Sequence, residues 1–349
     1  MNQIKVLKSV FILICFSNLY AQQNTIVPVR DSFISIATDA RAAGQGDIGV
    51  ATSTDTFSQF WNPSKYVFSD KKFDVGITNI PIKSNDFNGL SQLNLSFYNK
   101  LNNRSAYGLG FRVYATKANQ IVTYRTLPLQ DALELSIDGS YTLRLSNTFA
   151  MSVGGRFTLL QGKVLSDNFN NESSLYGVDV SGFYYGNEIA YNKFNGRWRT
   201  GFNFSNVRGS SLHDQKNIEI YAPSTLSVGA GFDFIFNQDK ILATTIEYKT
   251  LLNSYIENAN VEKSNFGLKG SVIALGLEFT YKEKLITRTG YSYGINRLTD
   301  SFVSIGAGFQ EKYLDVDIAC LLGLSEEENP IREKLRLSLS LNLIEVFLN

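Results

Sequence analysis

Polar and apolar residues alternate along most of the chain from Phe73 onward. The clearest case is the stretch 335–343, where every second residue is leucine and the residues between are Arg336, Ser338, Ser340 and Asn342. Because neighbouring side chains on a strand point to opposite faces, each such stretch predicts a strand with one apolar and one polar face. The pattern recurs in fourteen segments: 73–79, 90–99, 105–114, 132–143, 149–158, 175–191, 198–205, 225–235, 241–249, 270–281, 285–293, 301–309, 313–322 and 335–343.

The linkers between these segments are alternately long and short. A long linker, 80–89, precedes a short one, 100–104, and the same order continues with 115–131 and 144–148, 159–174 and 192–197, 206–224 and 236–240, 250–269 and 282–284, 294–300 and 310–312, and finally 323–334. Transmembrane β-barrels have short periplasmic turns and longer outer loops. The sequence therefore predicts an all-β fold, a 14-stranded antiparallel transmembrane β-barrel over 73–349. An even strand number places both ends of the barrel on the periplasmic side.

The composition agrees with strands that face lipid. Charged residues make up 19% of the chain, below the roughly 25% of soluble domains, and Phe and Tyr are abundant, at 25 and 18. No apolar run approaches the ~18 residues of a membrane helix, so strands must do the spanning. We expect the protein in the outer membrane of a Gram-negative cell.

Residues 1–21 have the features of a signal peptide. Lys5 and Lys8 precede an apolar core, and Ala21 ends a tolerable cleavage site. Cys15 follows the bulky Ile14, which disfavours lipidation. Cleavage would change the net charge from +1 to −1, so no overall positive field favours nucleic acid. Cys320 would be the one remaining cysteine, excluding an internal disulfide, and we expect it to face lipid.

Strand parity places a set of charged side chains on the face that we expect to line the lumen. Two interpretations compete: a translocation or ligand path lined with acids, and ion pairs that brace the wall or hold an internal plug. We favour the second, because an internal charge needs a partner whether or not it binds anything. The set is Arg112, Glu134, Asp138, Arg156, Asp179, Asp233, Glu247, Glu278, Arg288, Asp315, Asp317 and Arg336.

Residues 22–72 do not follow the strand pattern. Gly44, Gly46 and Gly49 allow tight turns and close backbone approach, but their spacing is not that of a phosphate-binding loop. We predict a compact, irregular hatch inside or under the barrel. A barrel of this size would otherwise leave a wide opening.

This part of the chain resembles a known family. The motif residues are Arg41, Gly44, Gly46, Asp47, Gly49, Trp61, Asn62 and Pro63. They resemble the FadL-type outer-membrane barrels, which have fourteen strands and an N-terminal hatch. The longer strings 36–53 and 58–66 are similar to the PorV (LptO) branch of the type IX secretion system of Bacteroidota, a system linked to gliding motility. The PorQ branch is a sister of similar build.

The PorV resemblance implies a protein that is not an enzyme and has no cofactor. Its implied partners are a giant outer-membrane translocon barrel, the C-terminal signal domains of secreted cargo, a surface attachment complex containing a sortase, and outer-membrane lipid. Apolar residues in the long linkers would then either dock a β-sandwich or simply cover the barrel mouth. These candidates are Ile121, Tyr124, Leu127, Leu212, Tyr221, Leu252 and Tyr255.

Two other function classes remain. FadL relatives take up hydrophobic compounds through a lumenal pocket and a lateral opening, which would require a strand kink at Gly154-Gly155 or Gly182. The charged lining argues against this alternative. An enzyme is disfavoured because the only histidine, His213, lies in a long linker, and no metal-ligand motif is present.

Overall fold

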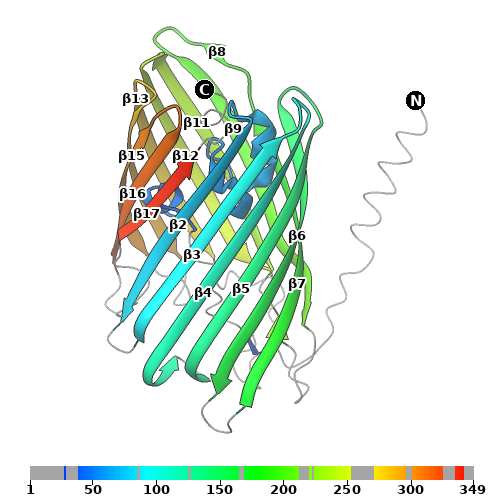
Figure 1. The fold of residues 1–349 in the computed structure, drawn as a ribbon. Coiled ribbons are helices and arrows are strands. Elements are labelled where there is room, and N and C mark those ends of the chain that lie inside the picture. The colour runs from blue at the N-terminus through cyan, green and yellow to red at the C-terminus, as the bar shows by residue number, and fades with distance from the viewer. Residues whose placement is uncertain are drawn as a thin grey trace, which may run out of the picture.

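Fourteen strands of the computed structural model form one closed antiparallel barrel (Figure 1). The structure describes residues 27–28, 38–84, 87–124, 127–164, 169–211, 220–221, 224–252, 271–295, 301–324 and 335–341. The barrel strands are β2 (Phe73–Ser84), β3 (Phe87–Lys100), β4 (Ser105–Tyr124), β5 (Leu127–Arg144), β6 (Phe149–Val164), β7 (Phe169–Tyr185), β9 (Asn195–Ser211), β11 (Thr225–Asn237), β12 (Lys240–Leu251), β13 (Val272–Tyr281), β14 (Leu285–Gly294), β15 (Phe302–Gln310), β16 (Leu314–Gly323) and β17 (Leu335–Leu341). The predicted fold class is confirmed.

Each strand pairs with its neighbours in chain order, and β17 closes the ring against β2 with Leu339 opposite Ile77. Three short strands lie outside the ring: β8 (Ile189–Ala190) pairs with the start of β9, and β1 (Val27–Pro28) pairs in parallel with β10 (Ile220–Tyr221). Among the described residues, no helix has the length and apolar character needed to span a bilayer.

Alternating burial along each strand separates the two faces of the wall. In β17 the four leucines are exposed, whereas Arg336, Ser338 and Ser340 are buried. β13 alternates in the same way from Ile273 to Phe279. The exposed set is apolar because it faces lipid, and the buried set is polar because it faces the interior.

The wall is much taller on one side than on the other. β4 has 20 residues and β5 has 18, whereas β15 has 9 and β17 has 7. Crossing the hydrocarbon layer takes about 9–11 residues, so the hairpins from β4 to β9 continue beyond it, away from the short turns (Figure 1). We call the two ends of the barrel the short-turn end and the hairpin end.

Several predicted linkers are therefore wrong in extent. Strand structure fills most of 115–131, 159–174 and 80–89, and continues to Ser211 within 206–224. The amphipathic alternation stops before these strands end, whereas the pairing between the strands continues. β-branched and aromatic residues such as those at 121–124 sustain it.

Near the other end, the predicted strand 175–191 is also wrong in extent. β7 ends at Tyr185, and β9 already begins at Asn195. The short β8 lies between them and folds back onto the start of β9. Gly186 begins the connection, its N–H donating to the Trp198 carbonyl.

The one marked irregularity among the described barrel pairings in the spanning region lies between β7 and β9. The register shifts twice there, and Asn206 adopts a positive φ of 55°. The Asn206 N–H donates to Asp179 rather than to a ladder partner. The uptake alternative would require a kink at Gly154-Gly155 or Gly182, but all three glycines pair regularly with their neighbouring strands. Asparagine tolerates this left-handed conformation better than most residues. A search of the sequence for glycines alone therefore does not find the irregularity at Asn206.

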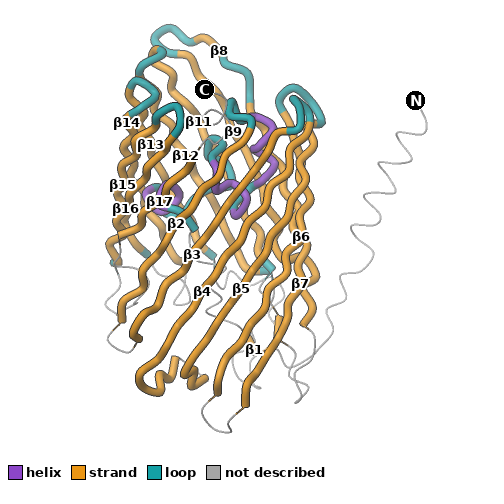
Figure 2. The backbone as a smooth tube through the Cα atoms, in the orientation of Figure 1, coloured by secondary structure: helices purple, strands orange, loops and turns teal. Residues whose placement is uncertain are grey.

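A chain segment with three short helices lies inside the ring of strands (Figure 2). The helices are α2 (Ala40–Gly44), η2 (Thr56–Phe60) and η3 (Pro63–Phe68). Most residues between Thr38 and Phe68 are buried. We call Thr38–Phe68 the lumenal segment.

Candidate functional site: the lumenal segment and its ion pairs

The lumenal segment begins with a capped helix. Asp39 accepts the N–H of Ala42 at 2.8 Å as the N-cap of α2, and it also accepts the indole N–H of Trp61 at 2.8 Å. Capping carboxylates satisfy helix N–H groups that otherwise lack partners. Burial, with a further contribution from Asp55, raises the pKa of Asp39 to about 6. One carboxylate thus joins the two halves of the sequence motif.

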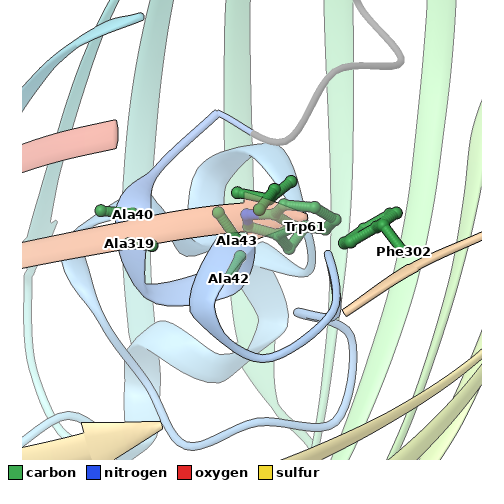
Figure 3. Packing of buried hydrophobic residues seen from close by; sticks show 7 residues of the cluster. Ala40, Ala42, Ala43, Trp61, Phe302 and Ala319 are labelled. Atoms are coloured by element: carbon green, nitrogen blue, oxygen red, sulfur yellow. The ribbon is translucent and has the colours of Figure 1, made fainter. Parts of the chain in front are cut away.

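Small side chains let α2 lie against the barrel wall. Ala40, Ala42 and Ala43 pack in one buried cluster with Trp61 of the same segment and with wall residues that include Phe302 and Ala319 (Figure 3). A Cβ added to Gly44 would lie 3.2 Å from the Cα of Gly306. The alanines and glycine of the motif therefore set the distance between helix and wall.

Two further positions of the motif require glycine, each for a different structural reason. Gly46 has a φ of +86°, where other residues are strained, and it lies against the backbone of Tyr291. A Cβ on Gly49 would lie only 2.3 Å from the ring of Trp61. The motif glycines therefore allow a tight turn and close packing, and Trp61 packs directly against Gly49.

Arg41 connects the segment to the far part of the wall. Its guanidinium donates to Glu278 at 2.9 and 3.0 Å and to Asp55 at 3.0 Å. Glu278 also pairs with Arg288 at 2.7 Å, which in turn pairs with Asp317 at 2.6 Å. Two arginines and three carboxylates form one mostly buried network, so the inward charges have partners.

Backbone groups of the segment are bound by the wall as well. Glu247 accepts the N–H groups of Gly49 and Val50, each at 2.9 Å. The Asn62 amide donates to the carbonyls of Val50 and of Gly182 on β7, at 2.9 and 3.0 Å. Asn62 therefore ties together the turn, the helix η3 and the barrel.

Two further arginines of the wall reach the segment. Arg199 pairs with Asp233 and donates to the carbonyl of Ala51, and Arg336 pairs with Asp47 at 3.2 Å. Arg199 was not predicted from the sequence. Strand alternation could have indicated its role, because the neighbouring Trp198 and Thr200 face outward and Arg199 must then face the lumen.

Lys65 is fully buried within the segment itself. Its ammonium donates to the Gly49 carbonyl at 2.7 Å and to the Thr52 hydroxyl at 3.1 Å. Burial lowers the pKa of Lys65 to about 8. This lysine fixes the Gly49 turn from inside, which no sequence pattern indicated.

A second network lies on β4 to β7. Asp138 pairs with Arg112 at 2.9 Å and with Arg156, and Arg156 also pairs with Asp179 at 2.8 Å. Arg112 lies over the ring of Phe60 of the segment, 5.1 Å from its centroid. This network therefore borders the lumenal segment.

The lumenal segment contacts all fourteen barrel strands. Its helices touch β2 to β7 and β14 to β17, and the turn 45–51 between α2 and η2 reaches β9, β11, β12 and β13. Its contacts thus extend around the whole inner circumference of the wall. Chemically, this arrangement holds a plug in place. Among the described residues, no three potential metal ligands cluster together.

The twelve charged residues that parity assigned to the lumen are all buried except Asp179, which is half-buried. Nine of them belong to the ion pairs described above. Asp315 instead pairs with Lys71 at 2.6 Å, Glu247 binds backbone, and Glu134 is buried near Arg112.

The candidate cargo residues divide into four groups. Ile121, Tyr124 and Leu127 belong to the β4–β5 hairpin rather than to a loop, and Tyr221 belongs to β10. Leu252 follows β12 and donates its N–H to the Ser224 carbonyl. Leu212 and Tyr255, like His213 and the signal peptide 1–21, lie outside the described residues.

Comparison with known proteins gives a family and a fold. A family model described as type IX secretion system protein PorV matches residues 19–256, more than half of the chain. The chain belongs to the PorV family. At the sequence level, no curated protein matches it.

Solved structures similar to this PorV-family chain include a toluene transporter and a hydrocarbon channel. The Pseudomonas putida toluene transporter TodX is 12% identical, with 86% of this chain and 95% of TodX covered and a TM-score of 0.52. The CymD monoaromatic hydrocarbon channel is 13% identical, with 89% and 98% covered and a TM-score of 0.53. At such identities the likeness shows the fold alone. Family and fold together place the protein in the outer membrane.

Proposed function

We propose that this PorV-family protein binds the C-terminal signal domain of secreted cargo and carries it from the translocon to a surface attachment complex containing a sortase. The observation that carries the proposal is the family match over the lumenal segment and the taller part of the barrel. In this account the protein is a membrane-anchored adaptor and not an enzyme. Its partners are the giant translocon barrel, the cargo domains, the attachment complex and outer-membrane lipid.

The topology that follows from this proposal has both chain termini in the periplasm of a Bacteroidota-like cell. Residues 1–21 are then a cleaved signal peptide and 22–72 a hatch. The short turns lie in the periplasm, and the β4–β9 hairpins project from the cell surface. Capture of a folded β-sandwich would occur there, because the strands of these hairpins are longer than a membrane crossing needs.

The interior of the barrel supports an anchor rather than an uptake path. The lumenal segment contacts every strand, and buried ion pairs link it to β13, β17 and, through Arg41 and Glu278, to β14 and β16. A hydrophobic solute would have to pass these charges, and breaking them inside a protein is costly. Uptake of hydrophobic compounds is the alternative, and the irregular wall at Asn206 is the observation in its favour.

The test replaces the candidate residues of the β4–β5 hairpin. The variant Ile121→Ser/Tyr124→Ser/Leu127→Ser should assemble normally but lose secretion and surface attachment of cargo. Its matched control is Leu101→Ser/Leu145→Ser, two exposed leucines in turns at the short-turn end, which should secrete normally. Normal secretion by the hairpin variant would contradict the proposed binding surface. A strain lacking the protein that fails in uptake of a hydrophobic compound, but not in secretion, would favour the alternative.

A further inference from the structure

The short-turn end of the barrel carries a stack of arginine and aromatic side chains that lies outside the two buried ion-pair networks. One of these arginines, Arg144, also donates to the carbonyls of Ser146 and Asn147 in its own turn. The guanidinium carbon of Arg144 lies 4.9 Å from the ring centroid of Phe68, at the end of the lumenal segment. The Phe68 ring lies 5.5 Å from that of Tyr185, and Arg197 lies 4.7 Å from the Tyr185 ring. We call these four residues the mouth cluster.

The mouth cluster points into the barrel opening rather than toward lipid. Arg144 shares the inward parity of the buried Thr142, and Arg197 that of the buried Arg199. Phe68 is the last residue of η3 and is half-buried. The cluster therefore lies between the lumenal segment and the short-turn end, where the interior of the barrel meets water.

Backbone hydrogen bonds join Arg104 to a member of the cluster and two lysines of the same rim to each other. The N–H of Lys100 donates to the Lys72 carbonyl at 2.7 Å, and that of Arg144 to the Arg104 carbonyl at 2.8 Å. Lys72 and Arg104 are exposed. The turns before β2, between β3 and β4 and between β5 and β6 thus place basic residues at neighbouring positions along this part of the rim.

The charge at this end is unevenly distributed among the described residues. On the half of the rim from β2 to β9, the exposed or half-buried cations exceed the anions by four: Lys72, Lys100, Arg104, Arg144, Lys193 and Arg197 against Asp70 and Glu188. On the other half the excess is one: Lys240, Lys282, Lys284 and Lys312 against Asp239, Glu283 and Glu311. Lys71 is omitted because it pairs with Asp74 and Asp315.

We propose that the mouth cluster and its neighbouring cations bind an acidic segment of a water-soluble protein at the short-turn side of the membrane. Guanidinium groups bind carboxylates through paired, directional hydrogen bonds, and Arg and Tyr are enriched where interfaces gain most of their affinity. Glu188, which pairs with Arg197 at 3.1 Å, occupies part of the site as an internal carboxylate. The inward direction of the arginines favours a peptide over a lipid headgroup. This binding is separate from cargo capture, which we place at the hairpin end.

The probe is a fluorescein-labelled ten-residue oligoglutamate, titrated against the full-length protein in neutral phosphatidylcholine nanodiscs. We expect saturable binding that weakens as salt rises, since exposed charges are screened. The variant Arg104→Gln/Arg144→Gln/Arg197→Gln should bind about tenfold more weakly, equivalent to about 1.4 kcal/mol. The control Lys240→Gln/Lys282→Gln/Lys312→Gln removes the same charge from the other half of the rim and should bind within about twofold of wild type.

Three results would overturn the proposal: no binding to wild type, equal weakening in both triple variants, or displacement of the bound peptide by soluble glycerophosphoglycerol, the phosphatidylglycerol headgroup, at a lower concentration than by free glutamate. The last would assign the cluster to lipid headgroups. Barrel assembly is checked by heat-dependent mobility on gels. The single change Arg104→Glu, at an exposed turn position, keeps the stack intact and should still weaken binding, so the proposal remains testable if the triple variant fails to assemble.

Discussion

At the scale of single residues, the motif is explained by contacts that join distant parts of the chain. Asp39 caps α2 and holds Trp61, and Arg41 reaches Glu278, 237 positions away. Parity along each strand was enough to place Glu278 and Arg288 on the inward face. It could not tell which inward charges pair, because pairing depends on strand register around the closed barrel and on the path of the lumenal segment.

Loss of the Arg41–Glu278 pair should destabilise the protein. Arg41→Gln leaves the buried Glu278 with fewer compensating partners, and breaking a buried pair costs about 3–5 kcal/mol. Urea unfolding in lipid vesicles measures the change. The double variant Arg41→Gln/Glu278→Gln should lose less than the two single variants added together. Strict additivity would show that the pair is not coupled.

Asp39 should make stability depend on pH. Its folded-state pKa of about 6 lies above the ordinary value of 3.8, so the folded state holds a proton that the unfolded state has released between these values. This carboxyl therefore contributes stability at low pH that is lost as pH rises to about 6, at most about 3 kcal/mol at 1.36 kcal/mol per unit.

The measurement compares unfolding of wild type and Asp39→Asn in urea from pH 4 to 7. The wild-type free energy of unfolding should fall relative to that of the variant between pH 4 and 6, and the difference should be constant above that range. A difference that does not change with pH would contradict the assignment to Asp39.

At the scale of elements, the number and faces of the strands were predictable, whereas their ends were not. Alternation reports a boundary between lipid and interior, so it identified all fourteen strands, but it did not continue through the far residues of the β4–β9 hairpins. The short helices of the lumenal segment gave no periodic pattern, because they are buried on all sides by wall and neighbours. The bulge at Asn206 was missed because asparagine supplies the positive φ.

The fit between the lumenal segment and Trp61 gives an element-scale prediction. In Gly49→Ala the new Cβ would lie 2.3 Å from the Trp61 ring, whereas in Gly155→Ala it meets nothing within 4 Å. Overpacking of this kind costs about 1–3 kcal/mol. Gly49→Ala should lower the temperature of the gel-mobility transition and expose the segment to protease. Gly155→Ala, on the wall, is the control and should behave as wild type.

At the scale of the whole molecule, the lumenal segment contacts every strand of the barrel from inside. Contacts from the lumenal segment to all fourteen strands predict that the wild-type protein conducts poorly in planar bilayers. A variant lacking residues 38–68 should conduct ions, because fourteen strands enclose a wide lumen when nothing fills it. Gel mobility confirms assembly of the deleted form. Equal conductance of the two assembled proteins would contradict a plug.

The central claim is that this plugged barrel receives secreted proteins at the membrane. Affinity purification of the tagged protein from native membranes, followed by identification of the co-purifying chains, tests it most directly. The account predicts a giant outer-membrane barrel together with secreted proteins that share a C-terminal domain. Recovery of neither, with a hydrophobic compound bound to the purified barrel instead, would contradict it.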